Sequence, residues 1–102
     1  MISAIGNNVP EAFANLSNAK TGIGKVNYLT TRYKDEYVLG EVKLSNTQLM
    51  DLISNHSPAL NRTSLLGIVA ASEALKHSGI NLKDGLRTGL ISSTTVAGMC
   101  KT

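Results

Sequence analysis

The feature that most constrains the fold is residues 61–75, a stretch with helical spacing that is apolar on almost every side. A helix of this kind normally lies inside a larger protein, because it has no polar face to turn toward water. Gly79 ends the helix, and residues 87–99 begin as a short apolar strand that continues into small residues and glycine. Near-continuous apolar strands are normally covered on both faces. The sequence therefore predicts that residues 61–99 form an interior slab of a layered protein.

Capping signals mark the first helix, which is expected over residues 9–19. Asn8 is placed to accept a hydrogen bond from the first turn, and Glu11 stands three residues later, as in a capping box. Its apolar stripe consists of Val9, Phe13 and Leu16.

Two further helices follow the same logic. Ser45 opens a short helix, with Gln48 three residues later. Its buried face is predicted to be Leu49, Leu52 and Ile53. The long helix is expected over residues 63–78, and its small residues are predicted to let neighbouring backbones approach closely: Gly67, Ala70, Ala71 and Ala74.

Two stretches have the character of strands. Residues 37–43 alternate, with Val38 and Val42 on one side and Tyr37, Leu39 and Glu41 on the other. Residues 87–94 form the second, which is predicted to be buried at Leu90 and Ile91. Because helices and strands alternate along the chain, the predicted class is α/β, with helices packed on a mixed sheet. The 102 residues form a single segment of at most one domain.

Composition excludes several classes of function. The net charge of +3 comes from dispersed basic residues without a stripe of stacking aromatics, which argues against nucleic-acid binding. A single cysteine allows no intrachain disulfide and indicates no metal cluster. No apolar run reaches the roughly 18 residues that a membrane span needs, and the N-terminus lacks the pattern of a signal peptide. We therefore expect a cytoplasmic protein without metal or cofactor.

Local motifs for catalysis are weak. Residues 21–25 contain two glycines before Lys25, but a phosphate-binding loop needs an earlier glycine and a Ser or Thr after the lysine. Cys100 is followed by no helix that would lower the pKa of its thiol, so it is interpreted as incidental. His56 lies before a Ser-Pro pair, and His77 lies in the last turn of the long helix. No orienting partner makes these residues a Cys/His hydrolase site.

Four stretches, in order, resemble the N-terminal part of the beta-ketoacyl-acyl carrier protein synthases, the condensing enzymes of fatty acid biosynthesis. Residues 2–9 resemble the turn after that family's first strand, and residues 20–24 resemble the loop that closes its first helix. Residues 37–42 are similar to its next strand, and residues 61–99 to its long helix and following strand. The resemblance spans nearly the whole chain.

The resemblance implies a partial thiolase-like fold, lacking the first strand and the catalytic region, within a 3-oxoacyl-[acyl carrier protein] synthase. This acyltransferase condenses an acyl thioester with malonyl-acyl carrier protein. Its expected partners are acyl carrier protein and acyl thioesters, and a homo-oligomer is expected. The family's catalytic cysteine and histidines lie beyond Thr102, so no catalytic residue is expected here and the segment itself is predicted to be inactive.

Two positions take roles from the resemblance. Val96 maps to an apolar side chain that lines the acyl-chain pocket, although Ala97 stands where the family often has glycine. Arg62 matches an arginine at the start of the family's long helix, where we expect a structural ion pair. Two alternatives stay open: a small non-catalytic interaction or dimerisation domain, and a catalytically dead condensing-enzyme homologue.

Overall fold

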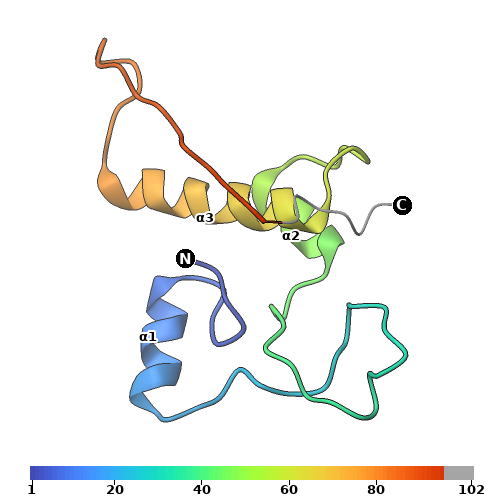
Figure 1. The fold of residues 1–102 in the computed structure, drawn as a ribbon. Helices are drawn as coiled ribbons and strands as arrows, with labels where there is room; N and C mark the ends of the chain where they lie inside the picture. The colour runs from blue at the N-terminus through green and yellow to red at the C-terminus, as the bar shows by residue number, and fades with distance from the viewer. Residues whose placement is uncertain (96–102) are drawn as a thin grey trace.

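Three helices form the framework of the computed structural model, which describes residues 1–95: α1 (Val9–Ser17), α2 (Asn46–Ile53) and α3 (Arg62–Ser78) (Figure 1). Helix α2 packs on α3, whereas α1 lies next to the N-terminal loop and does not pack against either of them. No helix within residues 1–95 has both the length and the apolar character needed to cross a bilayer.

Side-chain caps fix where the helices begin. The Asn8 side chain accepts a hydrogen bond from the Glu11 amide at 2.9 Å. At α2, Ser45 and Gln48 form both arms of the predicted capping box, at 3.2 and 2.8 Å. Each cap satisfies an amide that the helix leaves without an internal partner and contributes about 1 kcal/mol.

Helix α3 has its own cap and stop signals. Its first turn is capped by Asn61, whose side chain accepts from the Ser64 amide at 2.8 Å. Its end is marked by Gly79, which adopts a φ of 68°. This left-handed conformation explains why glycine, with no Cβ to clash, ends the helix.

The core lies between α2 and α3. Leu49 and Leu65 are completely buried there and Val69 is nearly so. The partly buried side chains that surround them are Ile2, Leu44, Met50, Ile53, Leu60 and Leu66. This is a small core, and it places the N-terminus of α3 directly against the chain that enters α2.

The N-terminal loop packs closely on α1 and on the segment that follows it. A Cβ on Gly6 would lie 2.4 Å from the backbone nitrogen of Ala12, the buried residue of α1. A Cβ on Gly22 would lie 2.4 Å from the backbone of Ala4. Glycine at both positions therefore lets two backbones meet.

The predicted α/β fold with helices packed on a mixed sheet is wrong. Residues 1–95 contain isolated bridges, Ser3 with Gly6 and Gly24 with Leu39, but no sheet. Of residues 37–43 only Leu39 makes a bridge, and residues 87–94 form no strand. The sequence pattern describes which side chains would suit a sheet, whereas a strand also needs a neighbouring backbone to bond with.

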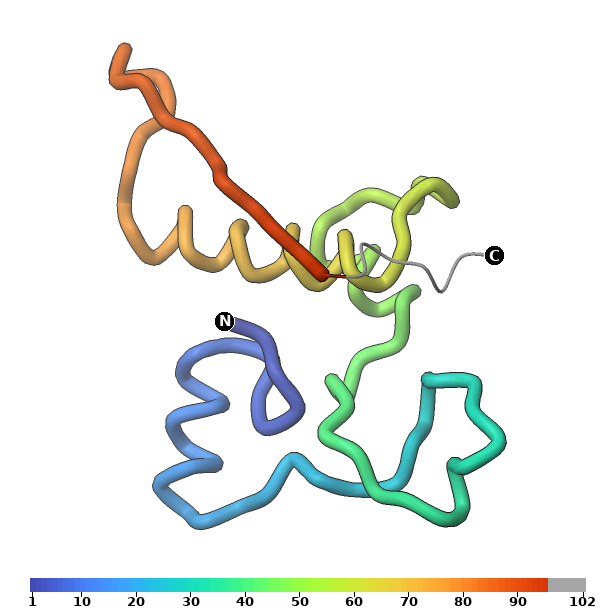
Figure 2. Tube along the Cα trace, viewed as in Figure 1, coloured from blue at the N-terminus to red at the C-terminus, as the bar shows by residue number. Residues whose placement is uncertain are grey.

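The predicted burial of the final strand is also wrong. Leu90 is 80% exposed and Ile91 is 100% exposed. Figure 2 shows the chain after α3 reaching a distant turn and returning as an extended segment. No second layer covers either side chain among the described residues, so the apolar surface expected inside a slab faces solvent.

The apolar surfaces of the helices are covered only in part. On α1 the side chains of Val9, Phe13 and Leu16 are exposed, with Phe13 at 71%. On α2 Leu52 is exposed, contrary to its predicted burial, while Leu49 is buried as predicted. A Cβ on Gly67 of α3 would meet nothing within 4 Å among the described residues, so the expected close approach of a neighbouring backbone does not occur there.

Candidate functional site

Arg62 joins the start of α3 to the chain that enters α2. Its Nη1 donates to the Leu44 carbonyl at 2.9 Å and to Asn46 Oδ1 at 3.0 Å. Its Nη2 donates to the Val42 carbonyl at 3.0 Å. A guanidinium suits this position because its rigid, planar fork of donors serves several oxygens at once.

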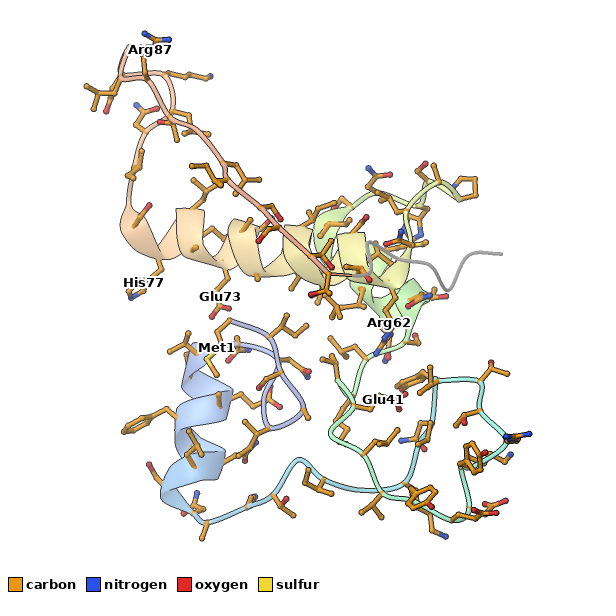
Figure 3. All side chains as sticks on the ribbon, in the orientation of Figure 1. Met1, Glu41, Arg62, Glu73, His77 and Arg87 are labelled. Carbon is orange, nitrogen blue, oxygen red and sulfur yellow. The ribbon has the colours of Figure 1, made fainter. Side chains whose placement is uncertain are left out.

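Tyr28 lies beside the same guanidinium. The Arg62 Cζ is 5.3 Å from the centroid of the Tyr28 ring, within the range of a cation–π interaction. This contact brings the loop that contains Tyr28 to the N-terminal end of α3, although the two residues are far apart in sequence. Figure 3 shows Arg62 and Glu41 near each other, between α3 and this loop.

The carboxylate of Glu41 accepts hydrogen bonds from three consecutive backbone amides. Asn27 donates to Oε1 at 2.8 Å and Leu29 donates to Oε2 at 2.8 Å. Tyr28 lies between them and donates to Oε1 at 3.1 Å and to Oε2 at 3.2 Å. Successive amides that converge on one point form an anion-binding concavity. In this chain the anion is the protein's own side chain.

Opposing effects set the pKa of Glu41. Partial burial acts to raise the pKa, because it penalises the charged form. The amide hydrogen bonds from Asn27, Leu29 and Tyr28 and the charge of Arg62 act in the other direction. Their combined effect is larger, so the pKa of Glu41 lies below its ordinary value and the carboxylate is held ionised.

A groove of about 850 Å³ borders this arrangement. Glu41 and Arg62 both line it. Its polar lining also includes Tyr28, Thr30, Asn46 and Asn61, and its apolar lining includes Leu29, Leu39, Leu60 and Leu66. The groove therefore combines a charged end, formed by Glu41 and Arg62, with an apolar wall.

A second carboxylate, Glu73 on α3, makes the contact between α3 and the N-terminal region. It accepts a hydrogen bond from the Val9 amide at 2.7 Å and pairs with the amino group of Met1 (Figure 3). The hydrogen bond from that amino group, followed by the one from Val9, lowers the pKa of Glu73. The groove beside it, of about 590 Å³, has mixed charge, with Glu11, Asp51 and Lys76 in its lining.

The titratable side chains in the linings of these grooves are mainly carboxylates, with Lys76 in one groove and Arg62 and Tyr28 in the other. Neither lining, as formed by residues 1–95, includes a histidine that could serve as a general base. Residues 1–95 also contain no group of three or more His, Cys, Asp or Glu side chains that could hold a metal ion.

The candidates from the sequence lie in different places. His56 contacts Asp51 at 3.1 Å, whereas His77 lies in the last turn of α3, near enough to Glu73 for its charge to act on that carboxylate. Val96 and Cys100 lie outside the described residues, so the acyl-pocket role of Val96 stays a prediction. Arg62 contacts the carbonyl and amide oxygens described above, and the ion pair that the resemblance implies for it also stays a prediction.

The loop at residues 21–25 does not have the geometry of a phosphate loop. Gly24 exchanges backbone hydrogen bonds with Leu39, at 3.0 and 2.9 Å, and Lys43 donates from Nζ to the Gly22 carbonyl at 2.8 Å. These contacts hold the loop against the segment that precedes α2.

The hydrogen bonds of Glu41 to the backbone were not predicted from the sequence. One signal was available, because Glu41 shares a face of the alternating stretch with two apolar side chains, Tyr37 and Leu39. A carboxylate on such a face needs a polar partner, but the pattern did not indicate that the partner would be the backbone of residues 27–29.

No protein-family model matches this chain, and neither a curated protein nor a solved structure matches it.

Proposed function

We propose that this chain is the N-terminal part of a beta-ketoacyl-acyl carrier protein synthase and is inactive by itself. The structural observation that carries the proposal is the amount of uncovered surface. The chain exposes 7960 Å², against about 5,500 Å² for a folded monomer of this mass. Its radius of gyration is 15.6 Å, against about 13 Å for a compact domain of this length.

The identity of the exposed side chains supports the same proposal. They include large apolar residues on α1 and on the chain beyond α3, among them Phe13, Leu86, Leu90 and Ile91. Monomeric proteins rarely expose large contiguous apolar surface. Further polypeptide that covers these side chains would complete the structure.

The choice of a condensing enzyme as the larger protein rests on the sequence resemblance alone. Four stretches follow the order of the condensing enzymes, and Arg62 stands at the first position of the longest helix, α3, as in that family. The proposed parent is an acyltransferase of the cytoplasm and acts as a homo-oligomer. Its partners are acyl carrier protein and acyl thioesters.

The chemistry of the parent requires groups outside this chain. An acyl group passes from carrier protein to a cysteine thiol, malonyl-carrier protein loses carbon dioxide, and the resulting carbanion attacks the thioester. Two histidines and an oxyanion hole support those steps in the family. In this proposal, residues 1–102 contribute packing surfaces and, through Val96, part of the acyl pocket.

Two measurements test the proposal. We expect the coding sequence after Thr102 to continue into a strand that ends in a cysteine between small residues, followed by two histidines. We expect the 102-residue chain to show no turnover in a condensation assay with radiolabelled malonyl-acyl carrier protein. Turnover by this chain alone, or a stop codon directly after Thr102, would contradict the proposal. A continuation that has the histidines but no cysteine would indicate an inactive homologue.

The apolar stripe on α1 favours a second candidate, a small interaction or dimerisation module. Val9, Phe13 and Leu16 repeat at helical spacing and are all exposed, which is the arrangement of a helix that packs into a groove. Sedimentation of the 102-residue chain with and without Phe13→Ser tests this candidate. A dimer that the substitution dissociates favours the module, and a monomer that binds a hydrophobic dye favours the incomplete enzyme.

A further inference from the structure

The backbone amides around Glu41 resemble an anion-binding site in which the Glu41 carboxylate takes the place of the anion. Three backbone amides, from Asn27 to Leu29, point at a single carboxylate, with donor–acceptor distances that begin at 2.8 Å. All four of these hydrogen bonds are accepted by the two carboxylate oxygens. Any carboxylate or phosphate oxygen of the right size presents the same acceptors.

Arg62 supplies the positive charge of the site and retains donors for a ligand. A guanidinium has five N–H donors. The described structure engages both hydrogens of Nη1 and one of Nη2, with the oxygens of Leu44, Asn46 and Val42. Among residues 1–95, no hydrogen bond uses the second Nη2 hydrogen or the Nε hydrogen, while the guanidinium itself is held in place by its three bonds.

The groove provides the space that an external ligand needs. Its volume of about 850 Å³ lies within the range of small-molecule sites, about 300–1,000 Å³. Glu41 and Arg62 lie on its lining, and Leu39, Leu60 and Leu66 supply an apolar wall. A ligand with an anionic head and an apolar body fits these surfaces.

We propose that the amides of residues 27–29, together with Arg62, form an oxyanion site in which Glu41 is an exchangeable internal ligand. A carboxylate or phosphate group seated in the groove takes the place of the Glu41 carboxylate, which moves into solvent. The exchange involves hydrogen bonds only, so no covalent bond forms or breaks. This site is independent of the condensing activity proposed above and does not require it.

The exchange predicts a defined competition. Glu41 is attached to the same chain and competes at an effective concentration on the order of millimolar. Removing its carboxylate therefore exposes the full affinity of the cradle. Glu41→Ala empties the site, and Glu41→Gln retains the shape of the side chain but replaces a charged acceptor with a neutral one.

The test uses the whole 102-residue chain and follows the backbone amide signals of Asn27, Tyr28 and Leu29 by NMR. Sodium acetate and inorganic phosphate are titrated separately at constant ionic strength, with chloride as the reference anion. We expect saturable shifts at these amides, with a Kd about tenfold lower in Glu41→Ala than in the wild type. The acetate and phosphate arms show which oxyanion the site prefers.

Two controls make the result decisive. Glu36→Ala removes an exposed carboxylate from the same loop and is expected to bind like the wild type. If Glu41→Ala fails to fold, Glu41→Gln replaces it in the test. We expect Glu41→Gln to bind acetate or phosphate more tightly than the wild type does. The absence of a saturable shift at the three amides would overturn the site. Equal Kd values in the wild type and the Glu41 variants would overturn the exchange. Binding by the variants alone would overturn the exchange.

Discussion

The two ends of α3 differ in how many of their polar groups are hydrogen-bonded and how many of their apolar side chains are buried. At the N-terminal end, Arg62 bonds three oxygens, Asn61 caps the first turn, and Leu65 is fully buried. Beyond the C-terminal end, the chain extends into solvent, with Leu90 and Ile91 bare. The comparison teaches that the groups at the start of α3 find partners within residues 1–95, whereas the large apolar side chains beyond its end stay exposed.

The largest expected loss of stability comes from a substitution at the N-terminal end of α3. Leu65→Ala removes apolar contacts and leaves a cavity between α2 and α3, so we expect a loss of about 2 to 3 kcal/mol in the free energy of unfolding. Urea denaturation followed by helical ellipticity measures it. The matched change Ile91→Ala alters a fully exposed side chain and should stay within about 0.5 kcal/mol. Equal losses in the two variants would remove the contrast between the ends.

Arg62 gives the next largest effect. Arg62→Ala leaves the partly buried carbonyls of Val42 and Leu44 without their donor, and we expect a loss of about 2 kcal/mol in the free energy of unfolding. Arg62→Lys keeps the charge but not the fork, so it should recover only part of that loss. Arg87→Ala serves as the control, because Arg87 lies at the exposed tip beyond α3 (Figure 3). The same urea titration applies, and an unchanged midpoint for Arg62→Ala would refute the anchoring role.

Substitutions of two glycines by alanine sharpen the comparison, because they are expected to change the stability of the chain in opposite directions. Gly22→Ala forces a Cβ against the Ala4 backbone and should destabilise the chain by about 1 to 3 kcal/mol. Gly67→Ala adds a Cβ in open space within a helix and should stabilise it by about 0.5 to 1 kcal/mol. Thermal unfolding of both variants measures the difference. In a longer protein that packs on α3 at Gly67, the second substitution would become destabilising.

The smallest expected effect is the pH dependence of stability that comes from Glu41. Because the pKa of Glu41 is lower in the folded chain, its contribution to stability is complete above the ordinary value of 4.5. That contribution decreases as the pH falls through the lower, folded-state pKa. The difference in unfolding midpoint between the wild type and Glu41→Gln should therefore be largest near neutral pH and shrink below pH 4.5. A difference that stays constant down to acid pH would show that the charge of Glu41 plays no part.

The helices could be predicted from the sequence because their signals are local. Asn8, the Ser45 and Gln48 pair, and Gly79 act within a few residues of the helix ends that they define. Such interactions depend on the chain nearby and need no tertiary structure. All three helices could therefore be located from the sequence: the first ends two residues earlier than predicted, and the third begins one residue earlier.

The sheet and the site were not predictable in the same way, because they depend on distant partners. An alternating stretch such as residues 37–43 is compatible with a strand, but pairing requires a second segment that the pattern does not identify. The cradle around Glu41 brings together residues 12 to 14 positions apart. Its donors are backbone amides, which leave no trace in residue type, so only the placement of Glu41 on an apolar face indicated that something polar lay opposite.

The bare segment at residues 86–91 has a consequence for how long such a chain survives in a cell. Exposed apolar side chains such as Leu86, Leu90 and Ile91 are the kind of surface that chaperones bind. The abundance of this chain in a cell would therefore depend on how fully those three side chains are covered.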